Sequence, residues 1–129
     1  MRTAAACLSL ALIAAPVWAD DEDVQLSTEE FLDLMDGRTA SFTLYGEPYG
    51  TEAYHPNHRV IWRDTRGQCQ EGTWRSFADN LCFQYENVSC WRVYRTEEGG
   101  HYAVTENDFR VDFDEITDGA FDCQGAPLS

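Results

Sequence analysis

The stretch from Gly67 to Trp91 constrains the fold of this chain more than any other segment. It reads GQCQEGTWRSFADNLCFQYENVSCW and contains three cysteines, two tryptophans and a run of alternating apolar residues. Alternation with a period of two indicates strands that are buried on one face, and the small polar residues between the runs are typical of tight turns. The segment therefore predicts short β-strands joined by tight turns and linked by disulfide bonds.

The first nineteen residues have the pattern of a secretory signal peptide. Arg2 supplies a positive charge, residues 8–17 form a short apolar run, and Val17 and Ala19 fit the small-residue rule for cleavage. A membrane anchor is disfavoured, because a spanning helix needs about 20 apolar residues. We expect a signal peptide over 1–19, an acidic linker over 20–26, a β domain with an N-terminal helix over 27–116 and an acidic C-terminal tail over 117–129. The protein would be periplasmic or secreted, with no membrane span after signal cleavage.

The cysteines that follow the leader are Cys69, Cys82, Cys90 and Cys123. An even number in a small exported domain predicts disulfides, whereas a zinc site needs close pairs of ligands that this spacing does not provide. Four cysteines allow three pairings. We expect Cys82–Cys90, because these residues lie on consecutive strands on either side of a turn. The second bridge would then be Cys69–Cys123, which would tether the C-terminal tail to the sheet.

The chain is strongly acidic, with a formal net charge of −14, and Arg2 would be lost with the leader. Acidic residues dominate both ends of the segment after the leader, while its centre is nearly balanced by arginines. Nucleic acids and anionic membrane surfaces are therefore poor partners. A basic protein or a small ligand remains as a candidate partner, and charge that serves only solubility is the simplest explanation.

A short helix is predicted to begin near Ser27. Ser27 can cap the first free amides, and Glu30 can complete a capping box. A helix of about nine residues is too short to be stable alone, so we expect it to dock on the sheet. Its apolar face would pack against side chains such as Phe42 or Trp62, and consists of Phe31, Leu34 and Met35.

The remainder of the chain predicts a sheet. Short runs rich in β-branched and aromatic residues recur with turn residues between them. The expected strands cover 39–45, 51–55, 59–64, 69–77, 81–86, 90–96, 101–105 and 109–113. The predicted fold class is mainly β, an antiparallel meander of six to eight short strands that forms a barrel-like or strongly bent sheet, with one short N-terminal helix.

Several motifs follow one another in a particular order. A Cys-x-x-Gly-x-Trp motif at 69–74 precedes Cys-Phe-x-Tyr-Glu at 82–86 and Cys-Trp at 90–91. Tyr54 and Pro56 come before the strand that carries Arg59 and Trp62. In this order the motifs resemble those of a family of small exported bacterial proteins of unknown function. The resemblance implies an envelope or secreted location in a bacterium, and it brings no activity with it.

Aromatic residues on the predicted strands have two possible roles. They can fill the core and pair across strands, which is the commoner case, or they can line a pocket for a sugar, lipid or peptide. The candidate ligand wall consists of Trp62, Trp74, Trp91, Tyr54 and Tyr85.

Signals for metal binding and catalysis are weak. His55 and His58 with Glu52 lack good metal-binding geometry, and the acidic run over 108–118 lacks the closing Glu of a calcium loop. No serine lies in a Gly-x-Ser-x-Gly elbow, and the cysteines are expected to be oxidised. We therefore expect no metal, no other cofactor and no catalytic residue.

These patterns favour a non-enzymatic envelope binding module that holds a ligand or a protein with its sheet or barrel mouth. An alternative is an inhibitor or scavenger of a basic protein such as a cell-wall hydrolase. A small hydrolase is the least favoured alternative.

Overall fold

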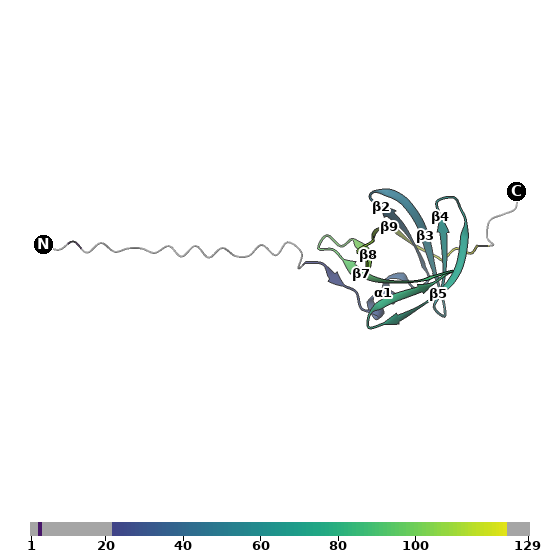
Figure 1. Ribbon diagram of the computed structural model, residues 1–129, viewed down its shortest axis with the longest axis horizontal. Coiled ribbons are helices and arrows are strands. Elements are labelled where there is room, and N and C mark those ends of the chain that lie inside the picture. The colour runs from purple at the N-terminus through teal and green to yellow at the C-terminus, as the bar shows by residue number, and fades with distance from the viewer. Residues whose placement is uncertain (1–2, 4–21, 124–129) are drawn as a thin grey trace.

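Eight antiparallel strands form a barrel in the computed structural model, which describes residue 3 and residues 22–123 (Figure 1). The strands of the barrel are β2 (Arg38–Leu44), β3 (Glu47–His55), β4 (Arg59–Asp64), β5 (Cys69–Phe77), β6 (Asn80–Gln84), β7 (Val88–Arg95), β8 (His101–Thr105) and β9 (Arg110–Asp118). Each strand pairs with the next along the chain, and β9 also pairs with β2, which closes the ring. The predicted fold class is confirmed.

The structure does not bear on the ends of the chain. Except for Thr3, the signal peptide expected over 1–19 lies outside the described residues. Residues 124–129 of the expected C-terminal tail also lie outside them.

Two strands are longer than the sequence pattern indicates. β3 begins at Glu47 rather than at Thr51, and β9 continues to Asp118 rather than ending at Phe113. Both extensions pair with β2, whose register shifts by a residue on each side. The added residues are mostly polar and half-exposed or exposed, so they carry no alternation that a sequence pattern can detect.

The acidic linker expected over 20–26 is structured where it meets the domain. Val24 and Gln25 form β1 (Val24–Gln25), which pairs with β7. The amide of Leu26, a buried residue, donates a hydrogen bond of 2.8 Å to the carbonyl of Val93. The acidic residues before Val24 make the segment over 24–26 look like part of a polar linker in the sequence. Its backbone is held by hydrogen bonding to β7.

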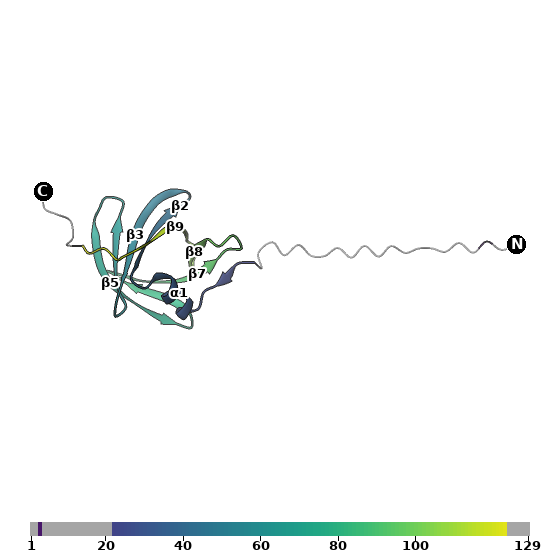
Figure 2. The ribbon, with the colours of Figure 1, turned by 180° about the vertical axis from the view of Figure 1, so that it is seen from behind.

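The helix α1 (Thr28–Met35) packs against the barrel, and Figure 2 shows this arrangement from behind. Its capping box is present as predicted: the amide of Glu30 donates to the hydroxyl of Ser27, and the Glu30 carboxylate accepts from the Ser27 amide. A second contact fixes the same end, because Thr28 donates from its amide and its hydroxyl to Asp79 in the turn between β5 and β6.

The apolar face of α1 closes one end of the barrel. Phe31 and Met35 are almost fully buried. Phe31 packs edge-on against Tyr54 and Trp74, at ring-centroid distances of 5.4 and 5.8 Å. The neighbours expected from the sequence, Phe42 and Trp62, instead pack against each other and against rings nearer the opposite end. The helix therefore forms the floor of the barrel.

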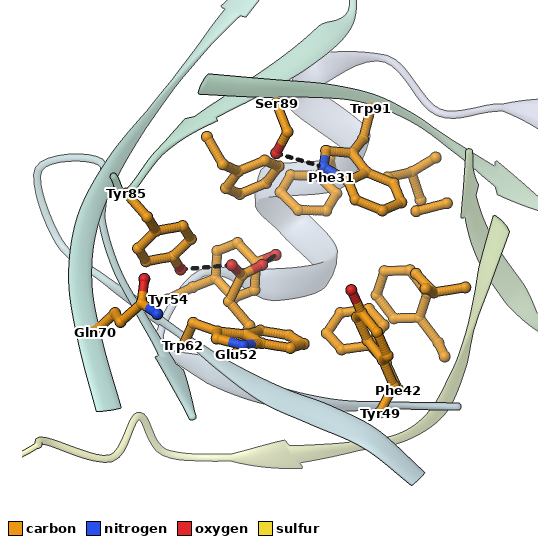
Figure 3. Close-up of a pocket in the computed structure, with 15 residues that line it drawn as sticks. Phe31, Phe42, Tyr49, Glu52, Tyr54, Trp62, Gln70, Tyr85, Ser89 and Trp91 are labelled. Carbon is orange, nitrogen blue, oxygen red and sulfur yellow. Dashed lines mark hydrogen bonds between the residues drawn. The ribbon is translucent and has the colours of Figure 1, made fainter. Parts of the chain in front are cut away.

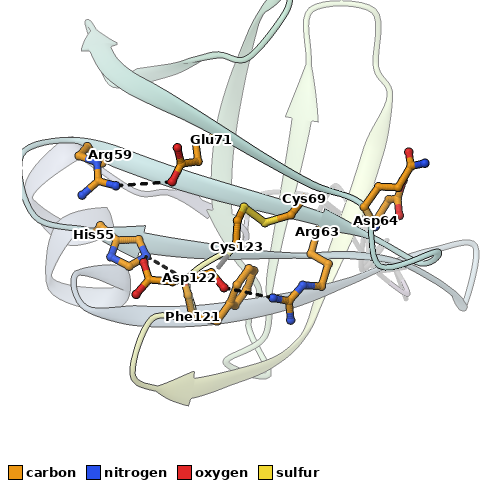
Figure 4. The surroundings of a disulfide bond; sticks show 10 residues. His55, Arg59, Arg63, Asp64, Cys69, Glu71, Phe121, Asp122 and Cys123 are labelled. Carbon is orange, nitrogen blue, oxygen red and sulfur yellow. Dashed lines mark hydrogen bonds and ion pairs between the residues drawn. A yellow bond between two sulfur atoms is a disulfide. The ribbon is translucent and has the colours of Figure 1, made fainter. Parts of the chain in front are cut away.

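The segment after β9 crosses the outer face of β3 and β4 (Figure 4). The disulfide between Cys69 and Cys123 anchors it, with the two Cα atoms 5.6 Å apart. Between the strand end and the bridge, the carbonyl of Phe121 lies 2.8 Å from the His55 ring, and the Arg63 guanidinium lies 4.2 Å from the centre of the Phe121 ring. The second disulfide joins Cys82 to Cys90 across directly paired residues of β6 and β7. Both pairings are those expected from the sequence.

Candidate functional site

A cavity of about 260 Å³ occupies the barrel interior between α1 and the opposite end. Figure 3 looks into it, with α1 crossing behind the side chains. The residues deepest in the cavity are buried, whereas Tyr49, Trp62, Tyr85, Trp91 and Phe113 are partly exposed. The complete lining consists of Phe31, Phe42, Tyr49, Glu52, Tyr54, Trp62, Gln70, Phe83, Tyr85, Ser89, Trp91, Val93, Ala103, Val111 and Phe113. An eight-stranded barrel has an interior of the size that holds side chains or one small ligand.

Strand alternation places these side chains inside the barrel. Directly paired residues of neighbouring strands point to the same face, and Glu52 pairs with Trp62, which in turn pairs with Gln70. Two residues further along β3, Tyr54 points inward as well. The outer face of the same strands carries His55 and Arg63, which contact the C-terminal segment.

Two glycines make room for the aromatic walls. A Cβ atom on Gly50 would lie 2.3 Å from the Trp62 ring, and one on Gly72 would lie 2.7 Å from the Tyr85 ring and 2.4 Å from the carbonyl oxygen of Gln84. Both glycines are on the inner face of their strands. The indole of Trp62 and the phenol of Tyr85 can therefore lie flat against the backbone, where any other residue would displace them.

Glu52 is the polar centre of the cavity. Its carboxylate accepts a hydrogen bond of 2.5 Å from the Tyr54 hydroxyl on Oε1 and one of 2.6 Å from the Tyr85 hydroxyl on Oε2. The residue is only 7% exposed. Burial raises the pKa of Glu52, because desolvation penalises the charged form, and the two tyrosine hydrogen bonds oppose that rise. Burial, and next the neighbouring Glu52 charge, raise the pKa of Tyr54 and Tyr85 above 10.0, so both hydroxyls keep their protons.

Rings pack against one another at the open end. Tyr49 lies 5.4 Å from Trp62 and 6.0 Å from Phe109 between ring centroids, and Trp91 lies 6.0 Å from Phe109. The Trp91 indole N–H donates to the Ser89 hydroxyl at 3.0 Å, which fixes the ring orientation. These contacts join rings from three separate parts of the chain around the mouth of the cavity.

The candidate ligand wall is brought together only in part. Trp62, Trp91, Tyr54 and Tyr85 line the cavity, whereas Trp74 does not. Trp74 is buried near α1, where its ring stacks on His58 at 4.2 Å. Its role is to pack the closed end of the barrel.

The histidine and acidic candidates are dispersed. The ring of His55 contacts the backbone of Phe121, and that of His58 contacts the carbonyl of Trp74, while Glu52 points into the barrel. Among the described residues no group of three or more His, Cys, Asp and Glu side chains has the proximity that a metal ion needs.

Sequence reasoning missed the interior position of Glu52. The signal was available in the segment Gly50-Thr51-Glu52-Ala53-Tyr54, because strand alternation puts Glu52 on the same face as Tyr54. An acidic residue between two inward positions of a strand is a departure from the usual apolar pattern.

Comparisons with protein-family models, with curated proteins and with solved structures find no match. The motif resemblance to small exported bacterial proteins therefore stays a prediction. Within the part of the chain that the structure describes, no helix has the length and apolar character required for crossing a membrane.

Proposed function

We propose that this protein is an exported, non-enzymatic binding module that holds one small ligand inside its barrel. The observation that carries the proposal is the aromatic cavity, which has a closed floor, an accessible mouth and a single buried carboxylate among the described lining residues. Mostly apolar walls with a few polar groups that converge on one point are the usual composition of small-molecule sites.

The cavity volume limits the size of the ligand. An apolar cavity of about 150 Å³ accommodates benzene, so a cavity of about 260 Å³ has room for about ten non-hydrogen atoms. The ligand we propose is therefore a small molecule or the terminal group of a larger one. Its apolar part would pack against the rings of Phe42, Trp91 and Phe113.

The proposed location follows from the disulfides and from the N-terminal pattern. Two disulfides are typical of a protein that folds in an oxidising compartment. The segment over 1–19 has the composition of a cleaved leader. Together they support a periplasmic or secreted protein.

Ligand binding can be tested by reducing the cavity from within. Ala103 is a buried lining residue on β8, and Ala103→Leu would extend a side chain into the cavity. The matched control is Val104→Leu, which enlarges the next residue of the same strand on the opposite face. Both variants and the native protein would be screened by thermal shift against small aromatic and aliphatic compounds, since a ligand of the native state raises the midpoint.

We expect compounds that raise the midpoint of the native protein and of Val104→Leu to lose most of that effect in Ala103→Leu. Compounds that stabilise all three proteins equally bind outside the barrel and would contradict the proposal. The midpoint of each unliganded variant reports whether it still folds.

The alternative of an inhibitor or scavenger of a basic protein rests on the net charge of −14. A pull-down at low and at physiological salt distinguishes it from the barrel proposal. Exposed charges are screened beyond about 10 Å at 0.1 M salt, so capture of a basic protein that is lost steeply with salt would favour the inhibitor.

A further inference from the structure

Glu52 has no positively charged partner within the described part of the chain. The ion pairs there all involve other carboxylates, on the barrel exterior or in the C-terminal segment. Of the residues that the structure describes, no arginine or histidine lines the cavity. A buried carboxylate is normally paired with a cation or bound to a metal, because removing it from water is costly. The two tyrosine hydroxyls lower that cost, but they are neutral, so the ionised carboxylate has no opposite charge beside it among the described residues.

The remaining surface of the cavity favours positive charge as well. Tyr54 and Tyr85 already direct their hydroxyl protons at Glu52, and Trp91 directs its indole proton at Ser89. The cavity surface therefore includes the remaining lone pairs of the Glu52 carboxylate and several aromatic rings, and its other polar groups, the Gln70 amide and the Tyr49 and Ser89 hydroxyls, are neutral. The negative face of an aromatic ring attracts a cation, most strongly for Trp.

We propose that the ligand of this cavity is a small organic cation, an amine or quaternary ammonium compound with an apolar body. The inference rests on the proposed function, and it adds the ligand class to it. The cationic group would lie beside the Glu52 carboxylate, between Tyr85 and the ring of Trp62. The apolar body would occupy the part of the cavity lined by Phe42 and Phe113, which pack on each other at 4.7 Å.

The same arrangement selects against anions. A fatty acid or another carboxylate would bring a second negative charge into a volume whose only acidic or basic side chain, among the described residues, is Glu52. Like charges in a poorly solvated site repel strongly. A neutral molecule would fill the volume without using the carboxylate.

Matched probes separate these three ligand classes. Acetylcholine is the cation, 3,3-dimethylbutyl acetate is its uncharged isostere, and phenylacetate is the anion, each with about ten non-hydrogen atoms, the number for which the cavity has room. Binding would be followed by tryptophan fluorescence, because Trp62 and Trp91 line the cavity. We expect acetylcholine to bind at least tenfold more tightly than its isostere and phenylacetate to bind most weakly.

The variant Glu52→Gln removes the charge and keeps the shape. In this variant we expect the affinity ratio of acetylcholine to its isostere to fall to within about threefold, since a neutral amide no longer attracts the cation. The control is Glu71→Gln, which removes an equal charge from an exposed carboxylate on β5 that pairs with Arg59 at 3.8 Å. Its affinity ratio should equal that of the native protein.

Each outcome bears on the inference. Equal affinity of the native protein for acetylcholine and its isostere, or tighter binding of phenylacetate, overturns the assignment of a cation while leaving the barrel as a ligand site. If Glu71→Gln loses the preference for acetylcholine over its isostere to the same extent as Glu52→Gln, the preference comes from the overall charge of the protein. That result also overturns the inference. Failure of all three probes to bind overturns it too, and the Ala103→Leu screen then decides whether the barrel binds anything. The comparison among probes needs only the native protein, so it stands even where Glu52→Gln does not fold.

Discussion

The two disulfides should differ in how much they stabilise the protein. The Cys69–Cys123 bridge spans 54 residues of sequence and the Cys82–Cys90 bridge spans 8. If the main effect is to restrict the unfolded chain, loop-closure entropy gives ~4 kcal/mol for the long loop and ~2.5 kcal/mol for the short one. Replacing Cys69 and Cys123 together by serine should therefore destabilise more than replacing Cys82 and Cys90 together.

The assay is urea denaturation of the two double variants and the native protein, followed by tryptophan fluorescence. The midpoint and slope of each curve give the free energy of unfolding. The variant without Cys69–Cys123 also loses the anchor of the segment that contacts His55 and Arg63, which adds to the entropic effect. An equal or smaller loss for this variant than for the Cys82–Cys90 variant would refute the loop-length reasoning.

Three further predictions concern the helix cap, the walls and the buried acid. Ser27→Ala should lower the free energy of unfolding by roughly 0.5–2 kcal/mol in urea titrations, because it removes the acceptor for the Glu30 amide. Gly72→Ala should cost roughly 1–3 kcal/mol in the same assay through its clash with Gln84, whereas Gly100→Ala has space and should cost far less. Because the folded pKa of Glu52 is raised above 4.5, its contribution to stability is greatest below pH 4.5 and is lost as pH rises through the folded value. Native stability relative to Glu52→Gln should therefore fall as pH rises above 4.5, and a difference independent of pH would contradict this.

Local signals in the sequence were sufficient for most of the fold. The capping residues Ser27 and Glu30 predict the start of α1, and the alternation around Val60 and Trp62 predicts β4. The Cys82–Cys90 pairing follows from the symmetry of one hairpin, and the structure places these two residues directly opposite each other. Each of these features depends on residues close together in sequence.

Other features depend on residues far apart in the sequence. The Cys69–Cys123 bridge was expected only because Cys82 and Cys90 were paired first, and no local pattern indicates the contacts between distant strands. Closure of the barrel by β9 against β2 joins segments about 70 to 80 residues apart, as Thr39 pairs with Thr117. The cavity depends on this closure, because Phe42 and Phe113 meet only across it. Trp62 and Trp74 both lie within predicted strands, so the sequence pattern does not distinguish them. Which of the two lines the cavity depends on which end of the barrel α1 closes.

Glu52 connects the stability of this barrel with its proposed activity. A buried carboxylate is less favourable than an apolar side chain of similar size at this position, since its charge is desolvated and meets no cation among the described residues. The surrounding structure is nevertheless arranged around it: Tyr54 and Tyr85 each donate to a different oxygen, and Gly72 leaves the space that Tyr85 occupies. If these residues served packing alone, a leucine in place of Glu52 and phenylalanines in place of Tyr54 and Tyr85 would fill the same space. A cation that enters the cavity would complete the electrostatics that the folded chain leaves unbalanced, and its binding would strengthen as Glu52 ionises.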